Sequence, residues 1–103
     1  MLKNTITDRR LRRIADHYGL TVQKNQLAEE CAELIHAISK TNRNPASEVA
    51  KANLIEELAD VSIMLEQVVY LMSCRLDVIE ITERKLDRTM RKMDEEDEER
   101  EDI

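Results

Sequence analysis

The chain has 103 residues, with one Gly, one Pro, no Phe and no Trp, and a formal net charge of −6. Because strands favour aromatic residues and need turn residues, this composition excludes a β-rich fold and predicts an all-α one, and the net acidity argues against a nucleic-acid polymer as a partner. No apolar run approaches the ~18 residues of a membrane span, no signal peptide is recognisable, and two cysteines make no disulfide framework, so we expect a cytoplasmic protein without a membrane partner.

Capping and turn signals predict the first two helices. The segment Thr5-Ile6-Thr7-Asp8 has the pattern of a capping box, which would open a first helix. Gly19 follows as the residue that closes this helix, because glycine readily adopts the backbone conformations found just after helix ends. Thr21 is then expected to cap a second helix that runs to about Lys40.

The second half of the chain predicts two further helices. Residues 42–47 form the one clear loop, with a proline as breaker, and Ser47 is the predicted N-cap of the next helix. This third helix should run from about Glu48 to Ser73. Asp77 begins a second capping-box pattern, so we expect a break near residues 74–77 and a fourth helix from Val78 onward.

An apolar residue recurs every seven residues in this half, which is typical of a coiled coil. The set, which we name the heptad seam, comprises Leu58, Leu65, Met72, Ile79, Leu86 and Met93. The companion positions begin with Val61 and Val68 but then carry only polar residues, so two helices are favoured over one long helix.

The domain organisation is expected to be simple. Residues 1–93 should form a single all-α domain, and residues 94–103, which carry eight acids and one Arg, should form an acidic tail. A core without large aromatic side chains is modest, so we expect homo-oligomerisation to bury what one protomer leaves exposed.

Two segments that start 27 residues apart, at Leu27 and at Leu54, repeat one acidic pattern. The first gives Glu30 and Glu33, and the second gives Glu57 and Asp60, each pair one helical turn apart. Two such helices face to face would bring four mutually repelling carboxylates together, and a hard divalent cation is the simplest group that neutralises them. The alternative is that these acids lie at the edge of the core and pair with Lys or Arg.

Helical angles sharpen this hypothesis. At ~100° per residue, Glu57 falls inside the apolar arc of the third helix and Asp60 lies at the edge of that arc. A carboxylate among apolar neighbours needs a partner, because its desolvation is otherwise unfavourable. Glu66 and Gln67 point away from the arc and are expected to be solvated.

With these residues in view, the chain resembles the MazG-like, all-α nucleoside triphosphate pyrophosphohydrolases. Their two-part signature corresponds to Glu29-Glu30-x-x-Glu33, a gap of 23 residues, and Glu57-x-x-Asp60. The lead-in His17-Tyr18-Gly19 and Gln23-x-x-Gln26-Leu27 is also similar, and the resemblance spans roughly residues 11–92. It implies a four-helix, bundle-like protomer that assembles into dimers or tetramers.

The resemblance also implies the chemistry. A (d)NTP would be cut between its α- and β-phosphates, which releases a nucleoside monophosphate and pyrophosphate with Mg²⁺, or alternatively Mn²⁺, as cofactor. Glu30, Glu33, Glu57 and Asp60 would be the metal ligands. Glu29 and Glu30 would be the catalytic residues, with Glu29 orienting the attacking water or supporting the ligands. The base, the sugar and the choice between normal and damaged nucleotides stay open.

Four residues are candidates for substrate contacts. The resemblance suggests that Lys85 and Arg88 contact phosphates, whereas the alternative is a basic surface that pairs with neighbouring acids. Gln23 and Gln26 are candidates for contacts with base or sugar, and the alternative is a pair of solvent-facing amides.

Two alternatives belong to other classes of protein. Glu33-Leu-Ile-His36 matches the Glu-x-x-His element of di-iron bundles, but the chain holds a single copy. The second alternative is a non-catalytic helical protein that oligomerises through the heptad seam. Binding of a divalent metal separates this alternative from the enzyme.

Overall fold

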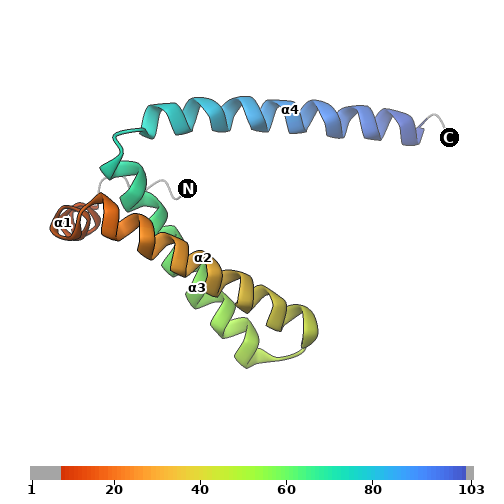
Figure 1. Ribbon diagram of the computed structural model, residues 1–103. Coiled ribbons are helices and arrows are strands. Elements are labelled where there is room, and N and C mark those ends of the chain that lie inside the picture. Colours follow the sequence, from red (N-terminus) through yellow and green to blue (C-terminus); the bar gives the residue numbers. More distant parts are fainter. Residues whose placement is uncertain (1–7, 102–103) are drawn as a thin grey trace. The chain divides into compact units, whose positions relative to one another are not determined.

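The computed structural model describes residues 8–101, which fold into four helices without a strand in that range, as the composition predicts. The helices are α1 (Arg9–Tyr18), α2 (Leu20–Arg43), α3 (Glu48–Leu71) and α4 (Arg75–Glu101) (Figure 1). The chain divides after Ser73 into two compact units, the first containing α1 to α3 and the second containing α4. In the described residues, no helix is both long and apolar enough to cross a membrane.

Asp8 caps the first helix. Its Oδ1 accepts a hydrogen bond from the backbone N–H of Arg10 at 2.9 Å, and the Arg10 guanidinium donates to Oδ2 at 2.8 Å. These hydrogen bonds from Arg10 lower the pKa of Asp8 to about 2. The helix therefore begins at Arg9, while the Thr5 end of the expected capping box lies outside the described residues.

Gly19 closes α1 and at the same time begins α2. With φ at +84°, it donates its backbone N–H to the carbonyl of Ala15 at 2.8 Å, as predicted for the helix end. Its own carbonyl accepts from the N–H of Gln23 at 3.1 Å, which is the first backbone hydrogen bond of α2. The prediction that Thr21 caps this helix is wrong, because Thr21 already lies in its first turn. The helix continues three residues past Lys40, to Arg43.

Ser47 caps α3 as predicted, and its Oγ accepts from the N–H of Ala50 at 3.1 Å. The break after α3 is also confirmed, but it lies earlier than expected, with Ser73 in the left-handed region at φ +52°. The carbonyl of Cys74 accepts from the N–H of Val78 at 3.0 Å, so helical bonding resumes before Asp77. The prediction that Asp77 caps α4 is therefore wrong.

In the first unit, α2 and α3 run antiparallel and side by side, joined by the short loop around Pro45 (Figure 1). α1 packs mainly against α3, where the Tyr70 hydroxyl donates to Asp16 Oδ1 at 2.9 Å. The buried apolar side chains are few and mostly small: Ala15, Ala37, Ala50, Met64, Val68 and Val69. Small side chains let helices approach closely. Most of the larger apolar residues of these helices lie outside this core.

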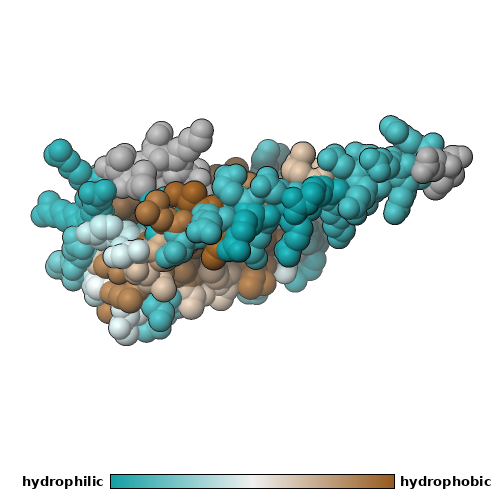
Figure 2. Space-filling model, turned by 90° about the horizontal axis from the view of Figure 1, so that it is seen from above, coloured by the Kyte–Doolittle hydropathy of each residue, from teal (hydrophilic) through white to brown (hydrophobic). Residues whose placement is uncertain are grey.

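The heptad seam is exposed throughout. Its six side chains keep between 38% and 55% of their surface accessible, and α4 buries none of its residues. The C-terminal part of α4 is hydrophilic on the face drawn in Figure 2. The seam is therefore not used to build the core of either unit.

Candidate metal centre

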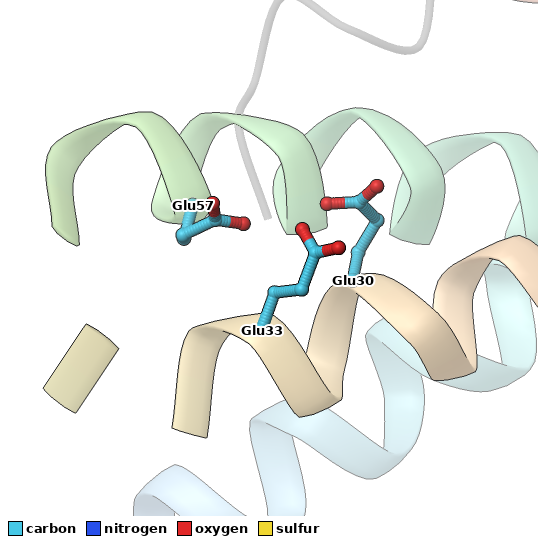
Figure 3. Close-up of side chains that lie close together, drawn as sticks. All are labelled: Glu30, Glu33 and Glu57. Carbon is cyan, nitrogen blue, oxygen red and sulfur yellow. The ribbon is translucent and has the colours of Figure 1, made fainter. Parts of the chain in front are cut away.

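Three carboxylates converge between α2 and α3. Glu30 and Glu33 lie one turn apart on α2, and Glu57 reaches toward them from α3 (Figure 3). Each residue offers one oxygen, and these three oxygens lie within 4.8 Å of one another. The structure thus brings together three of the four ligands that the two acidic motifs predict.

The carboxylates lack enough protein partners. Glu30 Oε1 accepts a hydrogen bond from Gln26 Nε2 at 2.9 Å, but Glu30 Oε2 and Glu57 Oε2 are buried without any hydrogen-bond partner. Within residues 8–101, no Lys or Arg forms an ion pair with Glu30, Glu33 or Glu57. The alternative in which basic side chains neutralise these acids is therefore not what the described residues show.

The direction in which the pKa of Glu57 is shifted agrees with the absence of a neutralising partner for its charge. Burial of this carboxyl raises its pKa, and the negative charges of Glu33, Asp60 and Glu30 raise it further. A group whose charged form is disfavoured by its surroundings holds either a proton or a cation. A divalent cation is a partner that several carboxylates can share.

The oxygen donors fit a magnesium ion. Ligand oxygens about 2.1 Å from one Mg²⁺ lie about 3 to 4.2 Å from each other. Carboxylate oxygens already within 4.8 Å of one another need only small side-chain adjustments to reach this geometry. The buried oxygens of Glu30 and Glu57 would gain the partner that the protein does not supply.

Residues 20–100 match the MazG nucleotide pyrophosphohydrolase domain. The chain belongs to the MazG family. The match contains both acidic motifs and nearly all of α4, and it begins at the first residue of α2. No curated protein and no solved structure matches the chain.

The other two acids of the MazG signature are placed differently from the central three. Asp60 is exposed, and it does not belong to the cluster whose carboxylate oxygens lie within 4.8 Å of one another. It is nevertheless near enough for its charge to raise the pKa of Glu57. Glu29 is exposed on α2. A ligand role for Asp60 and a catalytic role for Glu29 stay predictions.

The glutamines of the MazG domain are more buried than the sequence predicts. Gln23 and Gln67 keep 4% and 1% of their surface exposed, and Gln23 Nε2 donates to Gln67 Oε1 at 2.7 Å. The prediction that Glu66 and Gln67 are solvated is wrong, because Glu66 is also buried and α1 provides α3 with a second packed side. A solvent-facing Gln23 is likewise wrong, whereas its contact with substrate, like that of Gln26, stays a prediction.

The predicted phosphate-binding residues lie on α4. Lys85 and Arg88 are exposed and line a shallow pocket together with Arg84, Asp87 and Arg91. In the described part of the chain, neither Lys85 nor Arg88 forms an ion pair with an acid. His36 is exposed, and the cluster of Glu30, Glu33 and Glu57 contains no histidine. The described residues therefore do not form the ligand set of a di-iron site.

Proposed function

We propose that this MazG protein is a Mg²⁺-dependent nucleoside triphosphate pyrophosphohydrolase that converts a (d)NTP to the monophosphate and pyrophosphate. The observation that carries this proposal is the pair of buried, unpartnered carboxylate oxygens on Glu30 and Glu57. Membership of the family supports nucleotide pyrophosphohydrolase chemistry, and the three converging carboxylates support a metal. The proposed location of the reaction is the cytoplasm.

In this mechanism Glu30, Glu33 and Glu57 hold the ion, with Asp60 as a fourth ligand and Mn²⁺ as an alternative metal. When bound, Mg²⁺ supplies charge neutralisation for the triphosphate and an activated water. Gln26 holds the Glu30 carboxylate in place through its 2.9 Å hydrogen bond, which leaves the other oxygen of Glu30 for the ion. Glu29 orients the attacking water.

Lys85 and Arg88 bind the phosphates in this proposal. A triphosphate carries more negative charge than one divalent ion neutralises, so it requires further cations. Both side chains are exposed and neither is engaged in an ion pair within the described residues, which leaves their charges available for a ligand.

The exposed heptad seam supports a homo-oligomer. On α3 the seam residues Leu58 and Leu65 are exposed, and on α4 so are Ile79, Leu86 and Met93. Large apolar side chains that are exposed in a row on one helix favour contact with another protomer, because contact removes them from water. Light scattering after size exclusion should give a dimer or tetramer for the wild type and a smaller species for Leu86→Glu. Ile81→Glu, two residues away from the seam position 79, is the matched control and should leave the mass unchanged. An unchanged mass for Leu86→Glu would remove the seam from the interface.

Pyrophosphate release from a panel of dNTPs and NTPs with Mg²⁺ tests the enzyme. Turnover should vanish in EDTA and in Glu57→Gln, which keeps the shape of the side chain but loses its charge. Glu56→Gln changes the exposed neighbouring acid and should retain turnover. If no nucleotide is cleaved and Mg²⁺ does not raise the melting temperature, the metal site is refuted and the seam-based interaction protein becomes the better interpretation.

A further inference from the structure

We infer that the buried Gln23–Gln67 pair sets the register between α2 and α3 and thereby positions the metal-binding carboxylates. Gln23 is then a positioning residue that acts through Gln67 rather than a residue that contacts substrate. The inference rests on the metal centre of the proposed function, but it concerns residues that lie outside that centre.

The pair is a specific connection between the two helices. Gln23 Nε2 donates to Gln67 Oε1 at 2.7 Å, and both side chains are almost fully buried. Gln67 Nε2 in turn contacts the carbonyl of Ile63 at 3.4 Å and Met64 Sδ at 3.7 Å. Ile63 and Met64 lie on α3 together with Gln67, so the hydrogen bond between Gln23 and Gln67 is the contact of this group that depends on the alignment of the two helices.

The spacing links this pair to the carboxylates. Gln23 lies seven residues before Glu30, and Gln67 lies seven residues after Asp60. Seven residues are two helical turns, about 10.5 Å, so each glutamine shares a helix face with the acid of its own helix. In an antiparallel pair, the alignment that joins the glutamines also places Glu30 opposite Asp60.

The same alignment serves the second acidic pair. Gln23 lies ten residues before Glu33, and Gln67 lies ten residues after Glu57. Glu33 is therefore level with Glu57 along the two helices, as their convergence requires. One buried hydrogen bond thus fixes the relative height of all four acids.

The remaining core is poorly suited to this task. Its apolar members are mainly Ala and Val, which carry no hydrogen-bonding group that requires one particular partner on the facing helix. A buried polar pair is different, because a shift of one helix along the other breaks the hydrogen bond and leaves Gln23 Nε2 and Gln67 Oε1 buried without each other. Polar pairs that specify the register of packed helices act in the same way in coiled coils.

The test measures Mn²⁺ affinity of the full chain by calorimetry, without nucleotide. Gln23→Met/Gln67→Met removes the hydrogen bond and keeps side-chain length. Because both partners become apolar together, the melting temperature should stay close to that of the wild type. The affinity for Mn²⁺ should nevertheless fall by about tenfold or more, as when groups that orient metal ligands are lost. Gln23→Leu/Gln67→Leu is the second variant, should the first fail to fold.

A matched control separates positioning from stability. Val69→Ala removes buried volume from the same helix, so it should lower the melting temperature but leave Mn²⁺ affinity unchanged. Unchanged affinity in the folded double variant would overturn the inference, and a higher KM with unchanged Mn²⁺ affinity would make Gln23 a substrate contact. Absence of Mn²⁺ binding in the wild type would overturn the metal centre itself, and the register role with it.

Discussion

The acids of α2 and α3 and the bases of α4 form two charged regions that are held in different ways. Glu30 and Glu57 each bury an unpartnered oxygen between two packed helices, and the pKa of Glu57 is raised. Lys85 and Arg88 stand on a helix with no buried residue. Packing between two helices constrains the half-buried carboxylates of Glu30 and Glu57 and leaves one oxygen of each without a protein partner, whereas the exposed cations of α4 act mainly through their charge.

The largest effect is expected from an acid of the packed region. Glu33→Gln should lower both Mn²⁺ affinity and turnover by more than about 100-fold, because loss of a ligand exceeds loss of a group that orients one. Calorimetry and pyrophosphate release measure the two quantities. Glu56→Gln on α3 is the control. Should Glu33→Gln keep wild-type affinity, the convergence of the three carboxylates has no role in metal binding.

A smaller effect of another kind is expected from the bases. Lys85→Ala and Arg88→Ala should each raise KM for the triphosphate by about tenfold, since each removes one charge-assisted contact. Mn²⁺ affinity without nucleotide should not change. Arg100→Ala is the control, because this exposed base of α4 already faces Asp97 at 3.9 Å. If KM in all three variants equalled that of the wild type, these bases of α4 would be excluded from phosphate binding.

The same difference in packing explains what the sequence could predict. The meeting of Glu30 with Glu57 follows from helical periodicity and a short loop, both of which are local properties. The burial of Gln67 does not, because Gln67 contacts Gln23 across the helix pair, and α3 packs against α1 as well as against α2. Periodicity counted along one helix finds a single apolar arc and misses a second packed side.

Capping residues show the same limit. Ser47 was predictable because its loop contains a proline that fixes where the next helix can begin. Thr21 and Asp77 have the right chemistry for an N-cap. Each is preceded, however, by a residue with positive φ, and the helix begins between that residue and the expected cap. Gly19 and Ser73 are those residues, at φ +84° and +52°. The capping patterns of Thr21 and Asp77 contain no information on the conformation of these preceding residues.

The smallest effect concerns the stability of the metal-free protein, and its sign follows from Glu57. Its folded pKa is raised above the ordinary value of 4.5, first by burial and then by the charges of Glu33, Asp60 and Glu30. The folded state therefore binds this proton more tightly than the unfolded state does. That stabilisation is complete below the unfolded pKa and is lost as the pH rises through the folded pKa.

Melting temperatures in EDTA should accordingly show that Glu57→Gln gains stability relative to the wild type as the pH rises from about 4 to 7, because the variant carries no charge to desolvate. Mg²⁺ should raise the melting temperature of the wild type more at pH 7 than near pH 4.5, since the ion competes with the proton for the same oxygens. Lys85→Ala should follow the wild type in both series. A gain for Glu57→Gln that does not vary with pH would mean that neither burial nor the neighbouring carboxylates raise the pKa of Glu57. The acidic region would then resemble the basic one in acting through separate, solvated charges.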